Sequence, residues 1–594
     1  MPQALLRFAV IADSHVNPSD ADLISPYESH RLTNSRLEHT VRVLNALGPA
    51  FVMHVGDMVH PVPEAVSYPQ AVARFRRAIE GLAMPLHAVA GNHDIGDKLA
   101  DYVPAGSIRP EYLSLYREHF GPDYYSFDAA GCHFTVINTS LINSGLPQEA
   151  GQRAWLEQDL AANAGRRIFL FMHYPPFIAT PAEHGHYDNI DEPGRSDLLD
   201  LLQRHAVAAA FTGHVHNFFF NRHGATPIFS LPSTAFVRSD YTEMFSIGQP
   251  PAHENGRNDS AKLGVLVVDV YADRVVPQFI RTFDQMGSAD ARSAQRDWPL
   301  LPPAAGPMRA LGIDLRHGWT ELHSIPYSSM LDEFRRKQAR NDYPVMALWE
   351  MGIRRLRVPL DDLLDAMARE RMAALAALGA RFTVFSFGWP DAASLAVIAA
   401  HRELLAAVEV ILKWPLPADV DERLARLRAT CGVALHVSRF WSASGQSRDG
   451  KQIKLLVDHG FSAVSGDALA DSACVDPALA DPALADLAAA VRAGRRSRSA
   501  RASARALGLR QPRRRPQRPA HQWPPRAGSR AVRSHRACGR RFHRHARRRR
   551  SWLFPTRRPG RSALQSAPGR ARAAQSAWRA QHASPAPADR MAGT

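Results

Sequence analysis

The feature that most constrains this chain is the alternation, over residues 5–285, of short apolar runs with stretches of helical character. Seven runs are rich in Val, Ile, Phe and Ala and have the length of buried strands: "LLRFAVIA", "AFVMHVG", "PLHAVA", "CHFTVINT", "RRIFLFMH", "AVAAAFTG" and "ATPIFSL". Two more, "GVLVVDV" and "RVVPQFI", are separated by "YAD" and predict a hairpin. The pattern predicts a layered α/β domain over residues 1–285.

A second block of strands and helices follows a polar, Pro-rich linker at residues 286–308. Six strand candidates lie within residues 309–490: "ALGIDLR", "RRLRVPL", "RFTVFSFG", "VEVILKW", "VALHVSR" and "FSAVSGD". Ala- and Leu-rich helical stretches separate them, which favours a parallel sheet and suits a (β/α) barrel. Because such a barrel has eight strands, we expect a partial, TIM-barrel-like domain.

Charge is distributed very unevenly along the chain. Residues 1–490 carry a net charge of −12, whereas residues 491–594 carry +28, with 29 Arg and no Lys. This tail also lacks Ile, Tyr, Asn and Glu, so it cannot bury a core and we expect it to be disordered. Two origins stay open: a frameshifted reading of a GC-rich gene, or a genuine nucleic-acid-binding tail, for which no RNP-like or zinc-finger pattern is present.

The cysteines and the apolar runs bear on the compartment. Four scattered cysteines without a CxxC pair exclude a disulfide framework and a thiolate zinc site, and they fit a reducing compartment. No apolar run approaches the roughly 18 residues of a membrane span. The first apolar run lacks a cleavage region and leads directly into polar residues. We therefore expect a cytoplasmic protein without a membrane partner.

Five polar clusters follow successive strands of the first domain. They are "ADSH" (12–15), "VGDMVH" (55–60), "AGNHD" (90–94), "FMHYPP" (171–176) and "TGHVH" (212–216). The carboxyl ends of strands in an α/β sheet meet along one edge, where ligands bind. Each cluster alone has an ordinary interpretation, as a core histidine or a turn. All five in order predict a metal site, whose oxygen and imidazole ligands suit Mn, Fe, Zn, Ni or Co.

These clusters resemble the pattern of the calcineurin-like metallophosphoesterase superfamily: D-x-H, G-D, G-N-H-D/E, H and G-H-x-H. The resemblance covers residues 5–240 and implies a four-layer α/β/β/α sandwich with two divalent metal ions. By position, it implies that one ion is held by Asp13, His15 and His216. The other is then held by Asn92, His173 and His214, with Asp57 bridging both.

The function expected from this resemblance is hydrolysis of small phosphate esters by attack of a metal-activated hydroxide. His93 is left over as a non-ligand near the leaving-group oxygen, where it can donate a proton. We expect Asp94 to orient its imidazole. The substrates are phosphodiesters of the cyclic-nucleotide type or phosphomonoesters. The alternative is a nucleic-acid-binding phosphoesterase that uses the basic tail, and the complete ligand set argues against a degenerate scaffold.

Two further features refine this expectation. His60 stands where the purple acid phosphatase branch has tyrosine, and that branch lacks a histidine at the position of His15, so the chain looks closer to the cyclic-nucleotide phosphodiesterase branch. The long polar loop at 175–195 is expected to act as a substrate lid, with His184, His186 and Arg195 as phosphate or base contacts. A solvated loop is the alternative for each of these three.

The expected ligands all lie between Asp13 and His216. We therefore expect a chain ending near residue 290 to fold, bind metal and hydrolyse its substrate.

Overall fold

The computed structural model describes residues 4–20, 25, 27–245, 257, 259–282, 311–315, 318–326, 336–413, 418–441 and 456–458. The chain divides into two compact units, Met1–Leu509 and Arg510–Thr594, and every described residue belongs to the first. The predicted linker at 286–308, the sixth strand candidate "FSAVSGD" and the Arg-rich tail lie outside the described residues.

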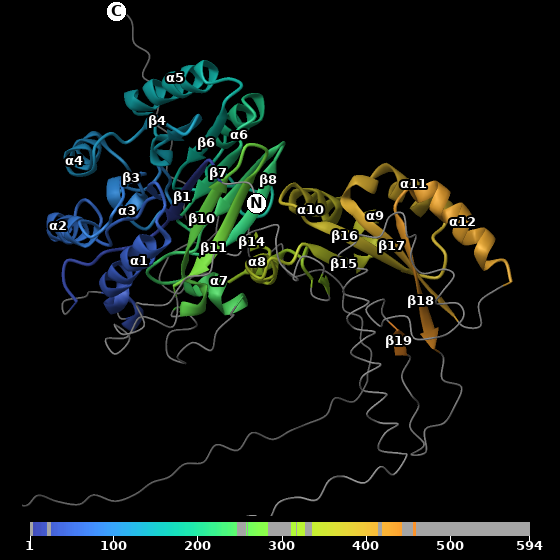
Figure 1. Ribbon diagram of the computed structural model, residues 1–594. Coiled ribbons are helices and arrows are strands. Elements are labelled where there is room, and N and C mark those ends of the chain that lie inside the picture. The colour runs from blue at the N-terminus through green and yellow to red at the C-terminus, as the bar shows by residue number, and fades with distance from the viewer. Residues whose placement is uncertain are drawn as a thin grey trace, which may run out of the picture. The chain divides into compact units, whose positions relative to one another are not determined.

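Two mixed sheets form the first part of the molecule (Figure 1). One has the order β11-β10-β1-β2-β3, with bounds β1 (Leu6–Ile11), β2 (Val52–His54), β3 (Leu86–Ala88), β10 (Gly264–Val270) and β11 (Val275–Arg281). The other has the order β4-β5-β6-β7-β9-β8, with bounds β4 (Tyr125–Ala129), β5 (Cys132–Val136), β6 (Arg167–Phe171), β7 (Ala209–Thr212), β8 (Phe219–His223) and β9 (Thr226–Ser230). The predicted hairpin is confirmed as the antiparallel pair β10–β11.

The alternation of side chains along each strand explains how these sheets are layered. Phe8 on β1 points inward, where its ring meets those of Phe134 and Phe169 from the other sheet at 5.5 and 5.4 Å. Its neighbours Ala9 and Ile11 point outward and pack on helix α1. On the second sheet, Ile168 and Leu170 likewise pack outward on α5 and α6. The order of layers is therefore α/β/β/α, as the resemblance implied.

The helices of this part include those two outer layers and shorter elements at the strand ends. Their bounds are α1 (Thr33–Leu47), α2 (Tyr68–Ile79), α3 (Asn92–Ile95), α4 (Pro110–Phe120), α5 (Pro147–Ala162), α6 (Gly194–Arg204) and α7 (Ser239–Met244). Three 3₁₀ turns are η1 (Glu28–Leu32), η2 (Thr139–Leu141) and η3 (Ser260–Lys262). Strands β4 and β8 had no counterpart in the sequence analysis, because both lie at the edges of their sheet and carry polar residues.

The second block contains a six-stranded sheet in the order β12-β15-β16-β17-β18-β19. Its strands are β12 (Gly312–Asp314), β15 (Arg355–Pro359), β16 (Arg381–Phe387), β17 (Leu405–Lys413), β18 (Ala434–Trp441) and β19 (Leu456–Asp458). The first five are parallel and follow chain order, as consecutive βα units of a barrel do, whereas β19 is antiparallel to β18. Within the described strands the sheet is open, so the barrel stays a prediction.

The remaining elements of the second block are a small hairpin and the helices between strands. The hairpin pairs β13 (His323–Ile325) with β14 (Lys337–Ala339). The helices are α8 (Tyr343–Glu350), α9 (Leu360–Leu364), α10 (Ala366–Ala377), α11 (Ala392–Ala400) and α12 (Val420–Cys431), with the 3₁₀ turn η6 (Arg402–Leu404).

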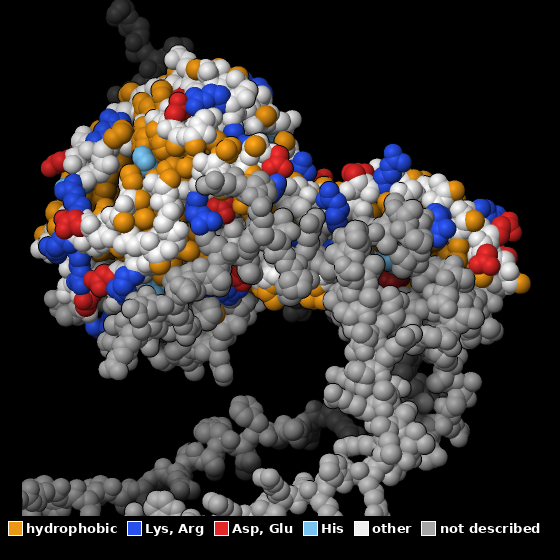
Figure 2. Space-filling view, viewed as in Figure 1, with side chains coloured by type: hydrophobic (Ala, Val, Ile, Leu, Met, Phe, Trp, Pro, Cys, Tyr) orange, Lys and Arg blue, Asp and Glu red, His pale blue; other side chains and the backbone are white. Residues whose placement is uncertain are grey.

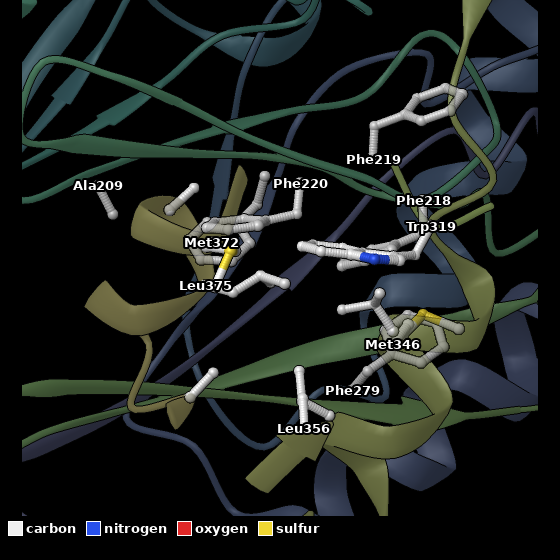
Figure 3. Close-up of a cluster of buried hydrophobic side chains, with 14 of the residues drawn as sticks. Ala209, Phe218, Phe219, Phe220, Phe279, Trp319, Met346, Leu356, Met372 and Leu375 are labelled. Atoms are coloured by element: carbon white, nitrogen blue, oxygen red, sulfur yellow. The ribbon is translucent and has the colours of Figure 1, made fainter. Parts of the chain in front are cut away.

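One hydrophobic core runs through both blocks. Phe218 and Phe220 from the first block belong to the same buried cluster as Trp319 and Met372 from the second (Figure 3). Polar contacts also join the two blocks: the backbone N–H of Phe220 donates to Asp342 Oδ2 at 2.9 Å. These contacts argue against the expectation that a chain ending near residue 290 suffices.

The surface shown in Figure 2 carries Lys and Arg side chains interspersed with Asp and Glu. This mixture fits the modest net charge of residues 1–490. In the described part of the chain, no helix has both the length and the apolar character needed to cross a membrane.

Candidate metal centre

Seven polar side chains gather where strands of the two sheets end. Asp13 and His15 follow β1, Asp57 follows β2, Asn92 begins α3 after β3, His173 follows β6, and His214 and His216 follow β7. None of the seven is more than 4% exposed. Burying this many polar groups together is unfavourable unless they bind one another or a ligand.

The backbone at this cluster adopts a conformation that non-glycine residues rarely take. Asp13, His15, Asp57, His214 and His216 have φ angles of 52°, 42°, 57°, 69° and 53°. Such left-handed conformations are costly and concentrate at functional sites, where the surrounding structure enforces them. Here they turn side chains from the strand ends toward a common point.

The first group of side chains consists of Asp13, His15, His216 and Asp57, which can together hold a metal ion. His216 donates its Nδ1–H to the carbonyl of Phe236 at 2.9 Å, so its Nε2 carries a lone pair. That Nε2 lies 2.9 Å from Nε2 of His15 and 3.5 Å from Oδ1 of Asp13. Ligand atoms that bind one ion at about 2.1 Å lie roughly 3–3.5 Å apart. The spacing therefore suits a single ion.

The second group brings together three atoms that are all hydrogen-bond acceptors when its two imidazole rings are neutral. His173 donates Nδ1–H to the carbonyl of Val55 at 2.8 Å, and His214 donates Nε2–H to the carbonyl of Tyr187 at 3.1 Å. The opposite nitrogens of these rings lie 2.9 and 3.0 Å from Oδ1 of Asn92. When both rings are neutral, these three acceptors converge on one point and need a cation between them.

Asp57 lies between the two groups. Its Oδ2 is 3.5 Å from Nε2 of His15, and its Oδ1 is 3.4 Å from Nε2 of His173. One carboxylate can thus contribute an oxygen to each group, as a bridging ligand does.

The electrostatics of the cluster favour bound cations. Burial raises the pKa of Asp13 well above its ordinary value, and Oδ2 of this side chain is buried without a hydrogen-bond partner among the described residues. Burial, with nearby positive groups, lowers the pKa of His15, His214 and His216 well below the usual value, which keeps these imidazoles neutral and able to bind metal. For His173, burial lowers the pKa, but the charge and hydrogen bond of Asp57, together with the charge of Asp13 and the hydrogen bond to Val55, raise the value to about 9. The surroundings that favour a proton on this nitrogen also favour a metal ion.

Comparison with known proteins identifies the family. The family model described as calcineurin-like phosphoesterase matches residues 6–218. A probable glycerophosphodiester phosphodiesterase, GpdQ, of Arcobacter nitrofigilis is 30% identical over 211 residues, which cover 35% of this chain and 70% of that protein. The chain belongs to the calcineurin-like phosphoesterase family.

Other relatives match this chain over smaller shares of their own sequences. The serine/threonine-protein phosphatase CPPED1 of Danio rerio is 30% identical over 189 residues, covering 30% of this chain and 58% of the relative. Purple acid phosphatase 21 of Arabidopsis thaliana is 31% identical over 154 residues, covering 24% of this chain and 33% of the relative. The chain thus spans little more than half the length of the CPPED1 relative.

Next to the cluster, Asp94 makes contacts that differ from the one expected. The carboxylate of Asp94 accepts backbone N–H bonds from Met58 at 3.0 Å and Gly91 at 3.0 Å. The imidazole of His93 instead directs Nδ1 at the carbonyl oxygen of His60. Within the described residues, Asp94 therefore shapes the loop that carries His93 rather than orienting its ring. Burial and the charge of Asp57 raise the pKa of Asp94 to about 8.

The three residues expected to contact substrate from the 175–195 loop have different surroundings. Arg195 is 2% exposed and donates to Glu192 Oε1 at 2.9 Å and to the carbonyl of Glu183. His186 is 1% exposed and lies 3.3 Å from Oε1 of Glu183. His184 is exposed. Arg195 and His186 therefore hold the loop together, and a substrate role for the three stays a prediction.

Sequence reasoning missed several residues around the cluster. Tyr187 accepts a hydrogen bond from His214 through its carbonyl and from the Asn92 amide through its hydroxyl, at 3.1 and 3.3 Å. Asp188 and Arg238 form a buried ion pair beside it. Two signals were present in the sequence, a polar "HYDN" inside the loop and "VRSD" after an apolar strand. Neither has a spacing that identifies its partner.

Gly91 gives a first prediction, because a side chain there would collide with the cluster. A Cβ at this position would overlap the backbone nitrogen and Oδ1 of Asp57. We expect Gly91→Ala to displace Asp57 and to lower bound metal, measured by elemental analysis of the purified protein, to one equivalent or fewer. The matched control is Gly151→Ala in helix α5, where the nearest atom is a tyrosine hydroxyl at 3.7 Å. Full metal content in Gly91→Ala would show that the Asp57 position is not critical.

Proposed function

We propose that this chain is a dinuclear-metal-dependent phosphoric ester hydrolase. The observation that carries the proposal is the convergence of acceptor atoms: Nε2 of His173, Nδ1 of His214 and Oδ1 of Asn92 meet within 3.3 Å of one another. A second set meets around Nε2 of His15 and His216, 2.9 Å apart. Family membership supports the same conclusion, because relatives bear the names of phosphatases and a phosphodiesterase.

In this proposal the seven side chains hold the two metal ions. Asp13, His15 and His216 hold one ion, and Asn92, His173 and His214 hold the other, with Asp57 between them. When bound, two such ions polarise the phosphoryl oxygens and activate a water molecule for attack on phosphorus. Backbone carbonyls fix the rings: Val55 orients His173, and Phe236 orients His216. This outer layer of hydrogen bonds keeps the ligand nitrogens aimed inward.

The proposed substrates are small phosphodiesters of the cyclic-nucleotide type or phosphomonoesters, and the metals are Mn, Fe, Zn, Ni or Co. The ligand atoms are nitrogen and oxygen without sulfur, which suits these ions. His60, in place of tyrosine, supports a site unlike that of the purple acid phosphatases. A nucleic-acid substrate depends on the tail, which lies outside the described residues, and stays a prediction.

The test is a hydrolysis assay on the metal-stripped full-length protein, reloaded with each of the five metals in turn. The substrates are bis(p-nitrophenyl) phosphate, p-nitrophenyl phosphate and a cyclic nucleotide. We expect turnover that is restored by metal and absent from the stripped protein. Turnover that is equal in the stripped and reloaded protein, or absent from every reloaded form, would contradict the proposal.

His93 gives a second prediction, as the proposed proton donor to the leaving group. It contributes no atom to the two ligand sets, although its backbone N–H donates to Oδ1 of Asp57 at 2.8 Å. We expect His93→Ala to retain both metals and to lower turnover by about 10²–10⁴, the range for a lost general acid. The loss should shrink for an ester with a very acidic leaving group, which needs no proton. An equal loss for all leaving groups would reject the role.

A further inference from the structure

We propose that Lys337, from the second block, is a positioning residue for the metal centre of the first. The inference rests on the proposed function, because it concerns the second set of ligands. Lys337 lies on β14, more than a hundred residues after the last expected ligand, and is 3% exposed. Its ammonium group reaches a buried cluster of charges beside His214.

In the described part of the chain, two cations and two anions form this cluster, and all four are buried. Lys337 donates to Asp188 Oδ2 and, at 2.6 Å, to Asp240 Oδ2. Arg238 donates to the other oxygen of Asp188 and, at 2.9 Å, to Asp240. The hydroxyl of Tyr241 donates to Asp188 Oδ2 at 2.7 Å. Among the described ion pairs, one ammonium and one guanidinium face these two carboxylates, so loss of Lys337 removes one of the two cations.

Asp188 connects this cluster to the metal centre. Its Oδ1 lies 3.8 Å from Nε2 of His214, and the preceding residue, Tyr187, accepts the hydrogen bond of that same nitrogen at 3.1 Å. The hydroxyl of Tyr187 accepts from the Asn92 amide at 3.3 Å. Residues 187 and 188 thus set the orientation of two of the three side chains proposed for the second ion. Groups that orient metal ligands from behind typically change metal affinity by about 10–100-fold when removed.

The segment around Tyr187 and Asp188 is also held by a residue other than Lys337. Loss of Lys337 can therefore affect the orientation of a side chain without unfolding the segment. Lys98, in the first block, donates to the carbonyls of His186 and Asn189 at 2.7 and 2.6 Å. The backbone on both sides of Tyr187 and Asp188 is therefore held independently of Lys337. Loss of Lys337 should leave the loop in place and change the direction of the Asp188 side chain, whose Oδ1 lies 3.8 Å from Nε2 of His214.

The test is Lys337→Met in the full-length chain, titrated with Co²⁺ after metal removal. Calorimetry gives the affinity of each equivalent, and the visible absorption of Co²⁺ reports the geometry of its ligands. We expect the first equivalent to bind as in the parent chain and the second about 10–100-fold more weakly, with an altered spectrum. The matched control is Arg281→Met, which breaks an ion pair with Glu350 at 2.6 and 2.8 Å that also joins the two blocks. This control should bind both equivalents normally.

The outcomes of this titration test the positioning role of Lys337 and the proposed function separately. If Lys337→Met binds both equivalents as the parent chain does, the positioning role is wrong. A parent chain that binds no Co²⁺ would overturn the proposed function itself. If Lys337→Met fails to fold, the charge-balanced pair Lys337→Met with Asp240→Asn replaces it, with the same expected weakening. Normal binding by that folded double variant would likewise overturn the role, as would equal weakening in Arg281→Met.

Discussion

Replacing Asp57 with alanine is expected to abolish hydrolysis and to remove one bound metal equivalent. The reason is that its two oxygens face different groups, 3.5 Å from His15 and 3.4 Å from His173. Two ions contribute several kcal/mol of charge stabilisation in the transition state, and about 1.4 kcal/mol corresponds to a factor of ten in rate. We therefore expect a loss of at least about 10³-fold in turnover, measured with the substrates and metals used above.

The control for Asp57→Ala removes another buried carboxylate. Asp123 is 2% exposed and accepts from Arg117 and Asn138 at 2.7 and 3.0 Å, away from the seven expected ligands. Asp123→Asn should leave the metal content and turnover close to those of the parent chain at a temperature where both are folded. Two tightly bound ions in folded Asp57→Ala would exclude the bridging assignment.

A chain ended at residue 290 is expected not to fold into a stable, metal-binding form. The buried carboxylates of Asp188 and Asp240 pair with Arg238 and Lys337 in the described part of the chain. A chain that ends at residue 290 lacks Lys337 and so loses one of these two cations. Leaving a buried charge without its partner costs about 3–5 kcal/mol. Phe218 and Phe220 also lose the cover of the second block, at about 1.5–3 kcal/mol each. Against a total stability of about 5–15 kcal/mol, these losses are decisive.

The comparison that checks this prediction is a chain ended at residue 490, where the Arg-rich tail begins. All described elements lie before that point, so it should give the near-ultraviolet circular dichroism and metal content of the full chain. The chain ended at 290 should show a flattened spectrum and little bound metal. A folded and active chain of 290 residues would restore the first expectation and make the contacts across the blocks dispensable.

The first half of the fold could be predicted because its information is local. Apolar runs such as that of β1 have the length and the β-branched residues of a buried strand, and each polar cluster directly follows its strand. The gathering of Asp13, Asp57, Asn92 and His173 then follows from strand ends meeting at one edge. Strands β4 and β8 were not predicted, because edge strands need to bury only part of their surface and therefore lack a continuous apolar pattern.

The remaining features of the site depend on contacts that sequence spacing does not encode. No sequence pattern identifies the hydrogen-bond partners of Asp94. Its carboxylate accepts bonds from backbone N–H groups of a loop some thirty-six residues earlier in the chain. Lys337 reaches Asp188 across a sequence separation of 149 residues. Left-handed backbone at Asp13, His15 and Asp57 is likewise imposed by tertiary structure, because these residue types do not require it.

Two Mn²⁺ ions that share Asp57 in one chain should be close enough to couple magnetically. The experiment loads the metal-stripped full-length protein with Mn²⁺ and records its electron paramagnetic resonance spectrum as the ion is added. We expect two equivalents per chain and, at the second, a spectrum of two magnetically coupled ions. Binding of a single equivalent, or of two ions that show no coupling, would contradict this expectation.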